Sequence, residues 1–389
     1  MKTIQIVGDS KYGGATYLIL EWCKYLLARH CQVDVLSTDA KTREALQKIP
    51  GVGIIDDIYI PREITPVQDL RALWQTINFL RRRKYDVVHT YTATPGFLGR
   101  LAARLAGVPV IVHHQAGWTV TEFSSRRERF IYTPLEYLAT CFSTKAICVG
   151  HAVYQAGRSL KIAPPSKLVT ICNGIEPRRF MEAARQGNGR ALRQELGLPP
   201  ATLLIGSTGR LSRQKDFGTL IQGAAMLREL EPTKPFAVVV AGDGPDRQAL
   251  EALARELHLA EQCHLPGFRQ DIPMFLASLD IFVSSSLWEG LSISLLEAMA
   301  TARPIVATSI LPNAELIEPE VTGLLVPPQD PASLARAMAR FIHEPTLAAH
   351  CAQQAQQRVL KNYSIDRMFQ ETWDLYVKAL QETCGSCHA

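Results

Sequence analysis

The chain alternates short apolar runs with longer segments in which apolar residues recur every three or four positions. Runs such as "TIQIV" (3–7) and "FAVVVAGDG" (236–244) indicate buried strands, because they are continuous and rich in β-branched residues. Segments such as "GFLGRLAARLAG" have helical periodicity, and this one closes on a glycine. Strands that alternate with helices predict parallel sheets joined by right-handed crossovers.

This alternation occurs twice. The first series has strands at 3–7, 32–38, 86–91, 108–114, 144–150 and 167–172, with helices at 17–28, 66–84 and 96–106. The second has strands at 202–209, 236–244, 262–267, 280–286 and 303–309, with helices at 217–230, 245–258, 271–278, 292–301 and 331–343. A polar connector around 176–192 separates them. We expect an α/β fold of two Rossmann-like domains, 1–180 and 190–363, whose parallel sheets face across a cleft. A last helix, at about 364–381, is expected to pack back on the first domain.

Length and composition agree with this picture. A chain of 389 residues suits two domains, and 47% hydrophobic with 20% charged residues is typical of a globular protein. No apolar stretch is long enough for a transmembrane helix, and the start lacks the apolar region of a signal peptide. Nine scattered cysteines predict reduced thiols in a cytoplasmic protein. The terminal "CGSCHA" has haem-attachment spacing, which we interpret as a chance match.

Charge is distributed unevenly. Residues 1–180 contain 24 Lys and Arg against 14 Asp and Glu, a net charge of +10, whereas the remainder has a net charge of −5. An ordinary solvated surface accounts for an imbalance of this size. A phosphate-bearing ligand or an anionic membrane surface accounts for it equally.

Three motifs follow predicted strands, where ligands bind in open parallel sheets. In "KYGGAT", Gly13 and Gly14 allow backbone amides to approach an anion, although a tight turn needs glycine for steric reasons as well. In "STGRLSRQKDF", Arg210 and Lys215 can bind a phosphate, or can simply be solvated surface cations. "AGDGPDRQAL" does not complete a dinucleotide fingerprint, because Arg247 replaces the third glycine, so it predicts a structural turn.

Two acids flank the apolar segment "EGLSISLLEAMA". On one helix, Glu289 and Glu297 would lie about 12 Å apart, so they would not meet. Gly290 instead places Glu289 in a loop and Glu297 in the helix that follows, and both can then face one polyol ligand. The loop amides of 290–293 can bind a phosphate or further hydroxyls. Alternatively, Ser294 and Glu297 form a capping box, which leaves Glu289 unexplained.

In this order, the motifs resemble the retaining glycosyltransferases of family 4, which have the GT-B fold. The resemblance covers nearly the whole chain: "GGAT", "NGIEPRRF", "GRLSRQKDF", "EGLSISLLEAMA" and "TGLLVPPQD" all match family motifs. It implies transfer of a hexose from a nucleotide sugar, with a UDP-sugar favoured, to an alcohol. It also implies that no cofactor or metal is needed, because cationic side chains can stabilise the leaving diphosphate.

The resemblance also implies roles for individual residues. Arg210 and Lys215 would bind the diphosphate and stabilise its charge, Glu289 would contact the transferred sugar, and Glu297 would bind the ribose. The remaining donor contacts would come from Gly13, Gly14, Phe268, Arg269, Gly290, Leu291 and Ser292.

Two positions depart from the family pattern. In "VHHQAGWT", Ala116 stands where many members have histidine, so His114 is the candidate substitute, and His113 is interpreted as a structural histidine. In "SILPNAEL", Glu315 keeps the acid, but the paired glycines that usually precede it are missing.

The acceptor is less specified. The segment 117–142 mixes arginines with aromatic residues (Phe123, Arg126, Arg127, Arg129, Phe130, Ile131, Tyr132, Tyr137), which suits either an amphipathic helix at the inner membrane face or an ordinary helix with a wet side. A lipid-linked glycan in polysaccharide synthesis or a small alcohol can therefore be the acceptor, and no nucleic-acid partner is expected. The alternative functions are a nucleotide-sugar epimerase and a non-catalytic sugar-nucleotide binding protein.

Overall fold

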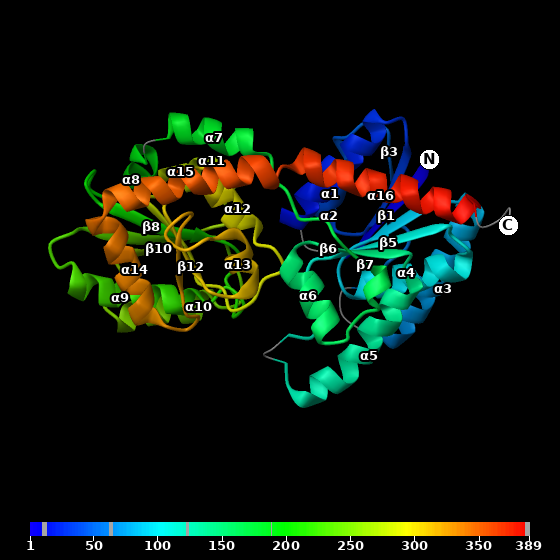
Figure 1. The fold of residues 1–389 in the computed structure, drawn as a ribbon, viewed down its shortest axis with the longest axis horizontal. Coiled ribbons are helices and arrows are strands. Elements are labelled where there is room, and N and C mark those ends of the chain that lie inside the picture. Colours follow the sequence, from blue (N-terminus) through cyan, green and yellow to red (C-terminus); the bar gives the residue numbers. More distant parts are fainter. Residues whose placement is uncertain (10–13, 62–64, 122–123, 188, 386–389) are drawn as a thin grey trace. The chain divides into compact units, whose positions relative to one another are not determined.

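The computed structural model describes residues 1–9, 14–61, 65–121, 124–187 and 189–385. The chain forms two compact units, each built on a parallel sheet (Figure 1). The first unit contains Met1–Cys172 together with Met368–Ala389, and the second contains Asn173–Arg367. Two parallel α/β units of GT-B type were expected from the sequence, and this fold class is confirmed.

The first unit has a seven-stranded sheet of order β3-β2-β1-β4-β5-β6-β7. Its strands are β1 (Lys2–Gly8), β2 (Gln32–Ser37), β3 (Val52–Ile55), β4 (Val87–Thr90), β5 (Val110–Gln115), β6 (Lys145–Cys148) and β7 (Leu168–Thr170). Its helices are α1 (Gly14–Ala28), α2 (Ala40–Gln47), α3 (Pro66–Arg83), α4 (Thr94–Ala106), α5 (Arg126–Phe142), α6 (His151–Ser159) and the short η1 (Pro165–Lys167).

Helices cover both faces of this sheet, which is why its strands are continuously apolar. On one face, Ile4 and Ile6 of β1 pack against α3 and α4. On the other face, Trp22 of α1 contacts Phe369 and Tyr376 of α16 (Ile365–Gly385), with ring centroids 5.2 and 5.6 Å apart. The last helix therefore packs on the first sheet beside α1 (Figure 1).

The second unit has a six-stranded sheet of order β10-β9-β8-β11-β12-β13. Its strands are β8 (Leu203–Thr208), β9 (Phe236–Ala241), β10 (Cys263–Gly267), β11 (Ile281–Ser284), β12 (Ile305–Thr308) and β13 (Leu324–Val326). Its helices are α7 (Pro177–Gln186), α8 (Arg190–Glu195), α9 (Phe217–Leu230), α10 (Arg247–Glu256), α11 (Ile272–Ser278), α12 (Ile293–Ala300), α13 (Leu311–Leu316), α14 (Pro331–His343) and α15 (Pro345–Asn362).

The core of the second unit lies between the sheet and helices α9, α10 and α14. Leu220 of α9 and Met338 of α14 are fully buried against Ile205 and Val283 of the sheet. Burying each such side chain contributes about 1.5–3 kcal/mol. Helices α11 and α12 pack on one another and on α7. This packing fixes the carboxyl ends of β8 and β11, where the candidate residues lie.

Candidate functional site

The candidate residues of the second unit gather where the order of the strands reverses. Strands β8 and β11 are neighbours in the sheet, although β9 and β10 come between them in the sequence. Arg210 and Lys215 follow β8, and Glu289 follows β11. In open α/β sheets, ligands bind at this kind of switch point, beyond the carboxyl ends of the strands.

Lys215 and Glu289 form an ion pair across this edge. Lys215 Nζ lies 2.6 Å from Glu289 Oε1, and the side chains are only 17% and 8% exposed. The stem of the lysine crosses Gly209, where a β-carbon would lie 3.0 Å from Lys215 Cε. A side chain at position 209 would therefore push the ammonium group out of place.

Arg210 differs from Lys215, the other cation of its motif, in having no ion pair with the described residues. It is exposed, and its side chain has no hydrogen bond or ion pair with any part of the chain that the structure describes. An exposed guanidinium in the same loop as Lys215 can bind an anionic ligand without first breaking an internal contact.

Glu297 lies in the middle of α12, not at its cap. Ser292 caps the helix, and its hydroxyl accepts a 3.4 Å hydrogen bond from the Leu295 amide. The expected alternative, a capping box of Ser294 and Glu297, is therefore wrong. Burial raises the pKa of Glu297 from 4.5 to about 7, and the positive charges of Arg179 and Lys215 oppose part of this shift.

The loop before α12 presents free backbone donors. The amides of Gly290, Leu291 and Ser292 have no backbone acceptor among the residues that are described. Together with the positive end of α12, they form a set of donors suited to phosphate or hydroxyl oxygens.

The segment expected to contact the nucleotide base contains an exposed aromatic residue, Phe268, and an ion-paired arginine, Arg269. Phe268 is 66% exposed just beyond β10. Arg269 Nη1 lies 2.6 Å from Glu195 Oε1, and Arg269 Nη2 lies 2.8 Å from Asp271 Oδ2. These carboxylates raise the pKa of Arg269, so this side chain stays charged and fixed, and contact with a base would come from the backbone here.

The "AGDG" turn is structural. A β-carbon on Gly242 would lie 1.8 Å from the Gly209 carbonyl oxygen, and one on Gly244 would lie 2.2 Å from the Leu211 carbonyl oxygen. The glycines therefore let the loop after β9 pack directly against the backbone of the Arg210 loop.

In the first unit, His113 and His114 have different surroundings. His113 is buried, its Nδ1 lies 2.8 Å from Thr90 Oγ1, and burial lowers its pKa well below the usual value. His114 is partly exposed, and its ring lies 5.6 Å from the ring of Tyr91. Of the glycine loop, Gly14 begins α1, whereas Gly13 lies outside the described residues.

One contributor was missed from the sequence. Arg179 lies on α7, within the segment interpreted as a connector, and it acts electrostatically on Glu297. Arg179 belongs to the motif "NGIEPRRF", but its proximity to Glu297 depends on how α7 packs on α12, which the sequence does not show. Glu315, retained in the divergent "SILPNAEL" segment, lies on α13 and is partly exposed.

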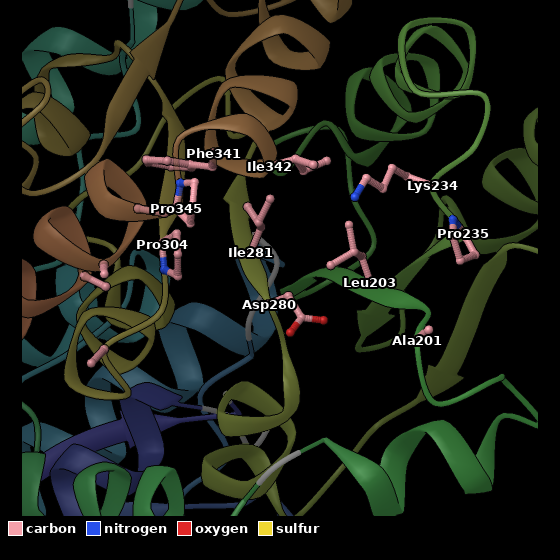
Figure 2. Close-up of a pocket in the computed structure, with 14 residues that line it drawn as sticks. Ala201, Leu203, Lys234, Pro235, Asp280, Ile281, Pro304, Phe341, Ile342 and Pro345 are labelled. Atoms are coloured by element: carbon pink, nitrogen blue, oxygen red, sulfur yellow. The ribbon is translucent and has the colours of Figure 1, made fainter.

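A separate hollow of about 430 Å³ lies at the opposite edge of the second sheet (Figure 2). Leu203 and Ile281, the first residues of β8 and β11, line it together with Phe341 of α14. Asp280 in its wall is already bonded to Arg193 Nη2 and to the Leu204 amide. Because it lies at the amino ends of the strands, it is distinct from the candidate site.

Comparison with known proteins agrees with this fold. The family model "Glycosyltransferase Family 4" matches residues 12–179, and "Glycosyl transferases group 1" matches residues 189–358. These two matches, on two parallel-sheet units, define a glycosyltransferase of GT-B type. The chain belongs to glycosyltransferase family 4, with a group 1 domain as its second half.

Individual relatives span most of the chain. It is 29% identical to the Escherichia coli UDP-Gal:alpha-D-GlcNAc-diphosphoundecaprenol alpha-1,3-galactosyltransferase, over 84% of this chain and 86% of that protein. It is 26% identical to the Salinispora arenicola D-inositol 3-phosphate glycosyltransferase, over 96% of this chain and 89% of that protein. The structure of Anabaena Alr3699/HepE in complex with UDP and glucose has the same fold, with a TM-score of 0.82, 22% identity, and coverage of 97% and 100% of the two chains.

Proposed function

We propose that this protein is a retaining glycosyltransferase that transfers a hexose from a UDP-sugar to an alcohol. The observation that carries the proposal is the Lys215–Glu289 pair at the switch point, with the exposed Arg210 in the same loop as Lys215. Two cations suit a diphosphate leaving group, and a neighbouring carboxylate suits the hydroxyls of the sugar. The Escherichia coli relative, named for a UDP-galactose donor, supports the choice of nucleotide.

The donor would be bound by the second unit. Arg210 and Lys215 would bind the diphosphate, and the free amides of Gly290 to Ser292 would add donors to it or to the sugar. Glu297 would accept hydrogen bonds from the ribose hydroxyls. In the first unit, His114 is proposed to contact the sugar and Gly14 to approach the phosphate.

The chemistry needs no resident metal in this proposal. Departure of the diphosphate develops negative charge on the leaving oxygen, and Arg210 and Lys215 would stabilise that charge directly. Nucleotide release that continues at an unchanged rate after EDTA treatment and dialysis supports this. Loss of activity that Mg²⁺ or Mn²⁺ restores would contradict it.

For the acceptor, we propose a lipid-linked glycan at a membrane surface. No helix in the described part of the chain is long and apolar enough to cross a bilayer. Helix α5 nevertheless begins with two exposed arginines, Arg126 and Arg127, and exposes several apolar side chains along its length. The exposed apolar residues are Phe130 (83% exposed), Ile131, Leu135, Tyr137 and Leu138. Such a helix suits the interface of an anionic bilayer, and the lipid-linked acceptor named for the Escherichia coli relative agrees with it.

Incubation of the full chain with UDP-, GDP- and ADP-sugars tests the donor proposal. Slow release of free UDP, and α-linked product from an α-linked donor by NMR, are the expected results. An isomerised sugar still attached to nucleotide would instead identify an epimerase, and binding without any reaction would identify a non-catalytic protein.

Vesicle sedimentation tests the membrane proposal. Phosphatidylcholine vesicles that contain phosphatidylglycerol should bind the chain, and Phe130→Ser should weaken this binding several-fold. Leu230→Ser removes an apolar side chain that is 51% exposed on α9 of the second unit, and it serves as the control. Equal binding by the two variants would refute a role for α5.

A further inference from the structure

Three consecutive serines are buried where β11 ends: Ser284 is its last residue, and Ser285 and Ser286 follow it. A buried hydroxyl costs stability unless it is hydrogen-bonded. Ser285 Oγ donates to the Lys215 carbonyl oxygen at 2.8 Å, and Ser286 Oγ donates to Glu289 Oε1 at 2.7 Å. Two of the three hydroxyls therefore bind the members of the ion pair, one through its backbone and the other through its carboxylate.

Gln214 binds the same loop from the opposite side. Its Nε2 donates to the Trp288 carbonyl oxygen at 3.0 Å and to Glu289 Oε2 at 3.3 Å. The backbone carbonyl oxygen of Gln214 accepts a hydrogen bond from the Leu287 amide at 2.8 Å. The loop after β8 and the loop after β11 are thus joined on both sides of the Glu289 side chain.

These contacts leave little of the Glu289 carboxylate unused. A carboxylate offers about four acceptor positions, two on each oxygen. Oε1 accepts from Lys215 and from Ser286, and Oε2 accepts from Gln214. One acceptor position, on Oε2, remains for a ligand hydroxyl, and its direction is set by the other three bonds.

Ser286 is held in turn by hydrogen bonds from the residues that end and follow β12. Thr308 at the end of β12 donates its hydroxyl to the Ser286 carbonyl oxygen at 2.6 Å. The fully buried Asn313 donates from Nδ2 to the Thr308 carbonyl oxygen at 3.0 Å. This chain of bonds begins in the "SILPNAEL" segment, where the chain departs from its family pattern, and it ends at the carboxylate.

We propose that Ser286 and Gln214 are positioning residues that orient the Glu289 carboxylate, so that it receives a single hydroxyl of the transferred sugar through Oε2. Neither residue contacts the sugar in this proposal, and both act through Glu289. The proposal rests on the proposed function, because it specifies how the sugar-facing acid of that site is held.

Double-mutant cycles on UDP release by the full chain test this. Using the UDP-sugar that reacts fastest, we expect Ser286→Ala and Gln214→Met each to lower kcat about tenfold to a hundredfold, because misplaced catalytic geometry has costs of this size. The KM for the donor should change less than kcat, because Arg210 and the amides of Gly290 to Ser292, which do not contact the Glu289 carboxylate, would still bind the diphosphate. Ser286→Thr, which keeps the hydroxyl, should restore most of the lost kcat.

The decisive comparison is made in the Glu289→Gln background. There, each change should lower kcat by less than about threefold, because residues that act through one group are not additive. The proposal would be overturned if the fold-loss of kcat in each double variant equalled the product of the fold-losses in the two single variants. Ser278→Ala and Gln222→Met are the matched controls: Ser278 is a buried serine bonded to the Met274 carbonyl oxygen in α11, and Gln222 is an exposed residue of α9.

Failure of the proposed function would be distinguishable from failure of this inference. If the wild-type chain releases no nucleotide from any donor, the proposed function fails. The same variants are then compared by their free energies of unfolding. The loss of stability in the Ser286→Ala, Glu289→Gln double variant should be smaller than the sum of the losses in the two single variants. Fully additive losses of stability would overturn the positioning contact by themselves.

Discussion

Burial raises the pKa of Glu297 toward neutral pH, and replacing this residue with glutamine tests the shift. Its carboxyl group lies within α12, where no hydrogen-bond partner is found for it among the described residues, and burial raises its pKa from 4.5 to about 7. Glu297→Gln keeps the shape of the neutral form and removes the titration. The variant should therefore match the wild type at low pH and exceed its stability at high pH.

The magnitude follows from the pKa difference. Because the folded state binds this proton more tightly than the unfolded state, it holds more protons between about pH 4.5 and pH 7, and the free energy of unfolding falls as the pH rises through that range. Each unit of pKa difference is worth about 1.4 kcal/mol. The wild type should lose about 3 kcal/mol across this interval, and Glu297→Gln should lose none of it.

Hydrogen exchange on the peptides of α12, corrected for intrinsic rates, measures this free energy in the second unit. We expect Glu297→Gln to exceed the wild type by about 3 kcal/mol at pH 8 and by little at pH 4.5. Glu256→Gln, at an exposed position of α10, controls for loss of a negative charge. The same difference at both pH values would refute the reasoning. If the ribose binds the ionised form, UDP affinity should also rise with pH up to about 7.

Other predictions follow from the same edge of the sheet. Arg210→Ala should lower kcat for UDP release about a hundredfold without changing the melting temperature, because the side chain is exposed and would act only on the diphosphate; full activity would end this assignment. Gly242→Ala should lower the free energy of unfolding by about 3 kcal/mol, because its β-carbon would overlap the Gly209 carbonyl oxygen. Gly197→Ala, with open space around it, should cost only about 1 kcal/mol in urea unfolding, and equal costs would contradict the packing argument.

The two parallel sheets were predictable because buried parallel strands leave a clear pattern. Continuous apolar runs located the central strands of both sheets, and α9 and α14 have the predicted bounds. The rule that ligands bind beyond strand carboxyl ends singled out Lys215 and Glu289, which are 74 residues apart in sequence and form an ion pair in the structure. The rule located these loops, whereas the roles expected of the two residues came from the resemblance to the glycosyltransferase family.

Elements with weak patterns were missed. The edge strands β3 ("VGII") and β13 ("LLV") are only four and three residues long, too short for a periodic signal. Helix α15 buries small residues, including Ala348, Cys351 and Ala355, so its packed face lacks the large apolar side chains that mark an amphipathic helix. Such elements are set by what packs against them, and a single sequence does not show it.

The start of α12 shows how spacing alone can mislead. Ser292 and Ser294 both precede the apolar face of the helix, and only Ser294 has an acid three residues later. In the structure the helix begins at Ile293, with Ser292 as its cap, and Leu295, Leu296 and Met299 are buried in its first turns. A cap at Ser294 would lose the helical turn that places Leu295 in the core, so burial outweighs the capping box.

The two glutamates of one motif have different environments, and their chemistry differs for that reason. Glu289 is ion-paired to Lys215 and accepts from two neutral donors, so its orientation is fixed and its charge is compensated. Glu297, with the same side chain, has only the more distant charges of Arg179 and Lys215, and burial keeps its pKa near neutral pH. Glu289 is therefore suited to hold a fixed acceptor position, whereas Glu297 is suited to exchange a proton.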